Sequence, residues 1–161
     1  MILEWKLLRG FSLLLLSAIL LGCDGSTGKK GAKEPSVQVI KVPLGDKAEK
    51  ELQRALIQIK PGGRIELEEG VYHCTRRLSL DVENVHIKGQ GKKKTILSFK
   101  GQKSGAEGLL VTKGGFTIED LAIEDSRGDA LKIKKARRVI IRRVRTEWTN
   151  GPDEKNGAYG I

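Results

Sequence analysis

Aromatic residues are scarce in this sequence, at 4% of 161 residues, and it holds only two cysteines, two histidines and four prolines. This small number of rings excludes a core built from large aromatic side chains. Aliphatic residues must therefore fill the interior. Hydrophobic residues make up 39% of the chain and glycines number 20. This composition suits thin, repetitive β-structure, and the length leaves room for one small domain.

Long apolar runs are also missing, since no stretch reaches the roughly 20 apolar residues that a transmembrane helix needs. The longest run, from Phe11 to Leu21, is interrupted by Ser12 and Ser17 and follows the basic residues Lys6 and Arg9. A short apolar segment behind a positive front is typical of a signal peptide. We therefore expect residues 1–22 to be a removable leader.

The end of this leader, Leu20-Leu21-Gly22-Cys23, resembles the lipobox of bacterial lipoproteins. The resemblance implies that Cys23 becomes the lipidated first residue of the mature protein, anchored in a membrane by its acyl chains. It also implies a place in the cell envelope, facing the periplasm or the exterior, and Asp24 after the cysteine points to the inner membrane. The alternative is an ordinary secretory leader in which the cysteine is coincidental.

Behind the leader, the Gly-, Ser-, Thr- and Lys-rich stretch from residue 25 to about residue 35 predicts a flexible tether. The expected organisation is a leader at 1–22, a lipidated tether and lead-in at 23–45 and one folded domain at 46–161. Without the leader, 28 basic side chains face 19 acidic ones. A basic surface outside the cytoplasm favours acidic partners, such as anionic lipids or polyuronates, over nucleic acid, although solubility alone explains it equally well.

Cysteine and histidine offer little chemistry here. If Cys23 carries lipid, Cys74 has no partner within the chain, and we interpret it as a small buried residue rather than a reactive thiol. His73 and His86 lie apart from any zinc-like grouping and are interpreted as structural or surface residues. No metal site or cofactor is identified, and a calcium ion stays an open alternative without support in the sequence.

One amphipathic helix precedes the strands. Its apolar positions recur at helical spacing, with Asp46 as the expected N-cap and Pro61-Gly62-Gly63 as the end. The residues predicted on its buried face are Ala48, Leu52, Ala55, Leu56 and Ile59.

After the helix, the hydrophobic period changes to two, and apolar pairs with one residue between them recur. One series aligns Leu67 with Ile87, 20 residues later, and Ile118 with Ile141, 23 residues later. A second series contains the pairs Leu109 and Val111, Leu131 and Ile133, and Tyr159 and Ile161, with spacings of 22 and 28. A period near 22 with short strands predicts a β-solenoid, whose turns bury their inward rows only by stacking.

Several motifs of this chain resemble the start of pectin lyase-like proteins. They are Leu52-Gln53-Arg54-Ala55-Leu56, Pro61-Gly62-Gly63-Arg64-Ile65-Glu66-Leu67, Glu69-Gly70-Val71-Tyr72, and Val85-His86-Ile87-Lys88-Gly89-Gln90-Gly91 with Thr95-Ile96-Leu97. The resemblance implies an all-β, right-handed parallel β-helix whose first coil is capped by a short helix. Because the chain stops at Ile161 within a repeat, we expect a domain truncated at its C-terminus. The alternative is a short solenoid with a partner covering its C-terminal coil.

Enzymes of the resembled superfamily are mostly polysaccharide lyases, epimerases and hydrolases, but no motif here commits the chain to a reaction. The loop at 147–156 offers Trp148 for stacking on a sugar, with Asp153 and Glu154 as acid, base or metal ligands. The bland alternative is a solvated loop in which Trp148 merely packs.

A basic stripe is also predicted, around one strand pair. Arg142, Arg143 and Arg145, together with Arg137, Arg138, Lys132 and Lys134, would suit a polyuronate, because guanidinium groups bind carboxylates bidentately. A solvated outer face is the alternative. The expected function is an envelope lipoprotein that binds or processes an acidic polysaccharide; the competing hypothesis is a noncatalytic scaffold or maturation protein.

Overall fold

The computed structural model describes residues 36–161 apart from residue 158. The predicted leader, Cys23 and most of the tether lie outside the described residues. The elements are β1 (Val39–Val42), α1 (Ala48–Gln58), β2 (Arg64–Leu67), β3 (Gly70–His73), β4 (Arg76–Leu80), β5 (His86–Lys88), β6 (Thr95–Ser98), β7 (Ser104–Val111), β8 (Thr117–Glu124), β9 (Leu131–Ile133) and β10 (Ile140–Glu147).

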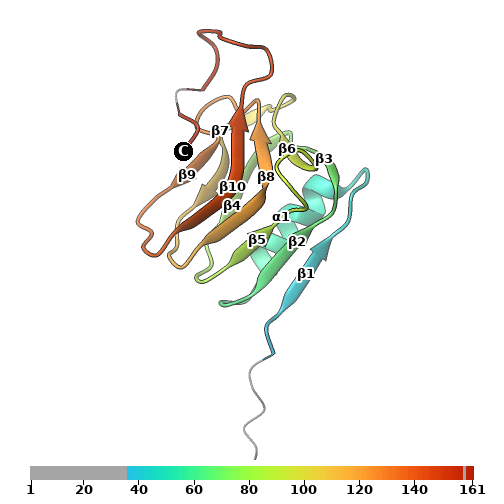
Figure 1. Ribbon diagram of the computed structural model, residues 1–161, viewed down its shortest axis with the longest axis vertical. Coiled ribbons are helices and arrows are strands. Elements are labelled where there is room, and N and C mark those ends of the chain that lie inside the picture. The colour runs from blue at the N-terminus through green and yellow to red at the C-terminus, as the bar shows by residue number, and fades with distance from the viewer. Residues whose placement is uncertain (1–35, 158) are drawn as a thin grey trace, which may run out of the picture. The chain divides into compact units, whose positions relative to one another are not determined.

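The described chain is mainly β, with 41% of it in strands, one short helix and two sheets in which every pairing is parallel. The larger sheet has the order β1-β2-β5-β8-β6-β3, with β10 paired to β8 (Figure 1). The smaller sheet has the order β4-β7-β9. No helix in the described part of the chain is long and apolar enough to cross a membrane.

Successive strand sets, which we call tiers, stack on one another. Tier 1 contains β2, β3 and β4, and tier 2 contains β5, β6 and β7. In tier 3 the single strand β8 pairs with β5 through its first half and with β6 through its second half, and β9 completes the tier. Tier 4 contains β10 and the last residues of the chain.

An isoleucine ladder runs through the larger sheet. Ile65 pairs with Ile87, Ile87 with Ile118, and Ile118 with Ile141. The predicted alignment of Ile118 with Ile141 is therefore confirmed. The alignment of Leu67 with Ile87 is wrong by two residues, because Ile65 is the partner; a shift of two keeps the same face of a strand, so the alternation alone does not reveal it.

A second ladder runs through the smaller sheet. Leu109 pairs with Leu131 and Val111 with Ile133, as their spacing predicts. The last step of this ladder differs from the predicted one. The Leu109 N–H donates to the oxygen of Ala130, the residue before its partner Leu131, and in the same way the Leu131 N–H donates to Gly160 O (3.1 Å). This pattern places Ile161, not Tyr159, beside Leu131. Tyr159 is 67% exposed. The connection between Leu131 and its partner is therefore two residues longer than predicted.

Helix α1 buries the predicted face, since Ala48, Leu52, Ala55 and Leu56 are buried, as is Ile59 at its C-cap. The prediction of Asp46 as N-cap is wrong. The N-cap is Lys47, and it makes no capping side-chain hydrogen bond. Instead, the Ala48 N–H donates to Gly45 O (2.9 Å), which closes a turn around Asp46 and leaves its carboxylate exposed.

The core is aliphatic, with three buried rings in Tyr72, Phe99 and Phe116. Cys74 is buried among these side chains, and burial raises the pKa of its thiol to about 12. The interpretation of Cys74 as a small buried residue is therefore confirmed. A thiol with so high a pKa carries almost no thiolate at neutral pH and is a poor nucleophile.

Candidate functional site

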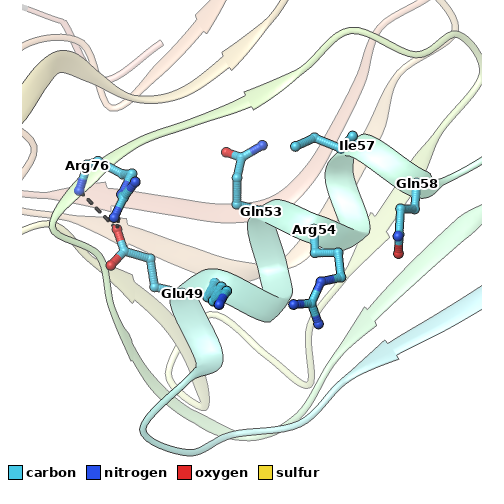
Figure 2. Close-up of a pocket in the computed structure, with 7 residues that line it drawn as sticks. Glu49, Gln53, Arg54, Ile57, Gln58 and Arg76 are labelled. Carbon is cyan, nitrogen blue, oxygen red and sulfur yellow. Dashed lines mark hydrogen bonds and ion pairs between the residues drawn. The ribbon is translucent and has the colours of Figure 1, made fainter.

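A groove of about 520 Å³ follows the outer side of α1 (Figure 2). Two of its polar side chains fasten the helix to β4. Glu49 accepts hydrogen bonds from the Thr75 N–H (2.8 Å) and the Arg76 N–H (3.0 Å). Gln53 bonds both backbone groups of Ser79. Because these bonds hold the helix over the first tier, we interpret the groove as structural.

A charged cluster on the outer face of the larger sheet is centred on Glu119 in β8. Its side chain is only 4% exposed, and it lies between the tiers above and below. His86 Nε2 lies 2.9 Å from Glu119 Oε1, while Arg142 Nε and an Arg143 terminal nitrogen donate to Oε2 at 2.8 and 2.9 Å. Three tiers are thus joined by one carboxylate.

The next residue, Asp120, adds a second ion pair. Asp120 and Arg143 both have left-handed backbone conformations, with φ of 59° and 53°. Both thus lie at a bend in their strands, and Arg143 Nε donates to Asp120 Oδ1 at 2.6 Å. The hydrogen bond from Arg143 is the main reason that the pKa of Asp120 lies below its usual range.

Glu119 is held ionised by its neighbours. Burial by itself raises the pKa of this carboxyl group, but the hydrogen bonds and charges of Arg142 and His86 outweigh burial and hold the pKa below its usual range. A carboxylate of this kind does not carry a proton at neutral pH. Glu119 therefore serves to organise the cations around it, and it is a poor general acid.

Three arginines of the predicted stripe, Arg142, Arg143 and Arg145, lie in one row along β10. Each one is already paired: Arg142 with Glu119, Arg143 with Glu119 and Asp120, and Arg145 with Glu124 and Glu147. Their guanidinium groups are therefore largely neutralised by the preceding tier, although Arg142 and Arg143 stay about half exposed.

A pocket of about 260 Å³ lies where β8 and β10 end. Trp148 is one wall, and its indole N–H donates to Ser126 O at 2.7 Å. Gly157 packs against the ring, since a Cβ there would lie 2.8 Å from Trp148 Cζ2. The pocket is lined by Lys100, Asp125, Ser126, Arg127, Trp148, Thr149, Asn150, Asp153, Lys155 and Asn156.

The carboxylates of this pocket hold the loop, whereas its cations do not. Asp125 accepts hydrogen bonds from the N–H and hydroxyl of Thr149, and Asp153 accepts one from the Lys155 N–H (2.8 Å). Within residues 36–161, apart from 158, no carboxylate lies within ion-pair distance of Lys100, Arg127 or Lys155. The pocket thus offers positive charge beside an aromatic ring.

The predicted site residues are therefore divided between two places. Trp148 and Asp153 line the pocket, whereas Glu154 is exposed and does not line it. Sequence reasoning missed Lys100 and Arg127, which reach the pocket from connections in the two preceding tiers. It also missed Glu119, although Glu119 precedes Arg142 by the same 23 residues that separate Ile118 from Ile141.

Metal ligands do not gather in the described residues, where no group of three His, Cys, Asp or Glu side chains is placed to hold an ion. Comparison with protein-family models, with curated proteins and with solved structures gives no match to this chain. The parallel fold, the Glu119 cluster and the Trp148 pocket are therefore the features of this chain that bear on its function.

Proposed function

We propose that this protein is an envelope-anchored lipoprotein with a right-handed parallel β-helix that binds an acidic polysaccharide. The lipobox ending at Cys23 supports the anchor. Three columns of parallel strands, repeated tier after tier, support a β-helix, and crossover connections between parallel strands are almost always right-handed.

The pocket beside Trp148 carries the binding proposal. A uronate residue presents a carboxylate on the rim of a ring with apolar C–H faces. Arg127 matches such a carboxylate with a planar fork, Lys100 and Lys155 add positive charge, and the indole offers a surface for the ring.

Binding is favoured over conversion by the condition of the carboxylates. A lyase, epimerase or hydrolase needs a group that gives or takes a proton at the reacting carbon or oxygen. Asp125 and Asp153 accept hydrogen bonds from the loop, and Glu119 is ionised between cations. These carboxylates organise the surface, so we assign no reaction to it.

The test measures the affinity of the chain from residue 23 for alginate, polygalacturonate and neutral dextran by isothermal titration calorimetry. We expect binding to the two polyuronates alone. Replacing Arg127 with Ala removes a charge-assisted hydrogen bond of about 1.5–3 kcal/mol, which weakens binding roughly 10- to 100-fold. The matched control Lys92→Ala removes one exposed charge elsewhere and leaves the affinity nearly unchanged. Equal binding of dextran, or equal loss in both variants, would exclude this site.

The anchor is tested separately by the mass of the N-terminal peptide of the membrane-extracted protein. A peptide beginning at a diacylated or triacylated Cys23 is the expected result. An unmodified peptide that begins elsewhere would remove the anchor from the proposal and leave the polysaccharide measurement unaffected.

A noncatalytic scaffold is the second candidate, and the last tier is the observation that favours it. Ile141 is 36% exposed, although it continues a buried ladder. Among the described residues, β10 pairs only with β8, so its other edge is open. A photo-crosslinker at position 141 that captures one defined envelope protein, together with no affinity for polyuronates, would favour the scaffold.

A further inference from the structure

The turns that precede β2, β5, β8 and β10 stack into one corner of the molecule. The Gly62 N–H donates to Glu83 O, the Asn84 N–H to Gly114 O, and the Gly115 N–H to Arg137 O. These bonds place each turn beside the next. We call the exposed cations of these turns the basic corner; they are Lys60, Lys113, Lys134, Lys135, Arg137 and Arg138.

Charge is concentrated in the last of these turns, where four of the five residues at 134–138 are exposed cations. In the described part of the chain, none of these four lies within ion-pair distance of a carboxylate. The acids of the corner are Asp81 and Glu83, in an earlier turn, and Asp81 already pairs with Lys113 at 4.0 Å. The last turn therefore differs from the arginine row of β10, whose cations are all paired.

The N-terminal side of the domain lies at the same corner. Gln38, close to the first described residue, accepts the Arg64 N–H at 2.8 Å and the Lys60 N–H at 2.7 Å. At about 4.8 Å per stacked strand, the last turn is about 20 Å further along the corner. The segment from residue 23 to residue 36 can reach about 45 Å when extended. A lipid on Cys23 therefore allows the whole corner to reach the membrane surface.

We propose that the basic corner rests on the anionic headgroups of the membrane that holds the lipid anchor. This inference depends on the anchor of the proposed function and adds an orientation to it. Lysine and arginine near an anionic leaflet each strengthen binding about fivefold, so the basic corner adds an electrostatic attraction to the membrane contact of the acyl chains.

The orientation has a consequence for the Trp148 pocket. Strands β8 and β10 begin at the basic corner, and the pocket lies where they end. Figure 1 shows the loop after β10 at the upper side of the view and the turns before β8 and β10 at the lower side. A corner resting on the membrane directs the pocket away from the bilayer, toward polymers in the surrounding space.

The test uses the chain from residue 23 with Cys23→Ser, so that no acyl chain contributes. Its partition onto phosphatidylcholine vesicles is compared with that onto vesicles in which phosphatidylglycerol replaces part of the lipid. One variant carries Lys134→Gln, Lys135→Asn, Arg137→Gln and Arg138→Asn. Asparagine is chosen where φ is 55° and 56°, because it tolerates the left-handed conformation. The matched control carries Gln at four other exposed lysines, Lys47, Lys50, Lys92 and Lys93.

We expect binding to the anionic vesicles alone, lost at high salt, and at least about fiftyfold weaker in the corner variant but about threefold weaker or less in the control. Equal losses in the two variants, or no loss in either, overturn the proposal. Weaker alginate binding in the corner variant with unchanged vesicle binding also overturns it and assigns the corner to the polysaccharide. The peptide mass alone reports whether Cys23 carries lipid, and the polyuronate affinity of Arg127→Ala alone reports whether the Trp148 pocket binds. Failure of the membrane orientation can therefore be distinguished from failure of the anchor or of the pocket.

Discussion

The first and last tiers present the same inward side chain in different surroundings. Ile65 lies between Ile40 of β1 and Ile87 of β5 and is fully buried. Ile141 continues the same ladder, but within residues 36–161, apart from 158, its ladder partner is Ile118 alone, and it is 36% exposed. The residue type is identical, so the difference comes from the number of stacked neighbours. A parallel ladder buries an isoleucine fully only when it is covered from both sides.

The largest effect that would test this comparison is expected from shortening a covered isoleucine. Ile118→Ala leaves a cavity between tiers and is expected to lower the free energy of unfolding by about 2–5 kcal/mol. Ile141→Ala removes the same atoms from a half-covered position and should cost under about 1.5 kcal/mol. Guanidinium denaturation followed by circular dichroism measures both. Equal losses would mean that the last tier is covered in solution.

A smaller loss in the free energy of unfolding is expected from a change in the Glu119 cluster, which joins three tiers. Glu119→Gln leaves Arg142, Arg143 and His86 without their shared carboxylate and should cost about 1–3 kcal/mol near neutral pH. Glu154→Gln, at an exposed carboxylate, is the control and should change stability by less than about 0.5 kcal/mol.

The pH dependence of Glu119 has a definite sign. Its pKa is lowered in the folded protein, so its stabilisation is fully present above the ordinary value of 4.5 and is lost as the pH falls through the lowered value. The difference in melting temperature between the wild type and Glu119→Gln should therefore shrink on acidification below pH 4.5. A difference that grows in acid would show that the carboxylate is not ionised in the folded state.

The smallest stability effect is expected where the helix is fastened to the first tier. Glu49→Ala removes the acceptor for Thr75 and Arg76 and should cost about 1–2 kcal/mol. Because this change loosens α1 from the first tier, backbone hydrogen exchange in β4 should accelerate. The first tier would then resemble the uncovered last tier. Lys50→Ala, one position along the helix and exposed, is the control. Unchanged exchange in β4 would mean that packing alone holds α1.

Much of the fold followed from the alternation of apolar residues. The pairs at Leu109 and Val111 and at Leu131 and Ile133 predicted both a strand and its partner, because inward aliphatic residues must stack in a parallel ladder. The errors concern register. Ile65 rather than Leu67 pairs with Ile87, and Ile161 rather than Tyr159 follows Leu131, because a shift of two residues preserves the pattern.

The candidate site was less accessible to sequence reasoning. Basic residues around Arg142 predicted a single stripe. In the described part of the chain, Lys132 and the arginine row on β10 pair with carboxylates, whereas the cations of the turn at 134–138 have no carboxylate within ion-pair distance. The acids that pair with Arg142 and Arg143 are Glu119 and Asp120, and they lie in the preceding tier. Only the stacking register shows that they lie beside the arginines.

By itself, the sequence determined the mainly β character, the buried face of the helix and the place of the aliphatic ladders, because each depends on local periodicity and on burying apolar surface. Only the tertiary structure decided which cations are neutralised and which stay free, and which isoleucines are covered. Those properties depend on the residue one tier away, about 4.8 Å distant in space but more than 20 positions away along the chain.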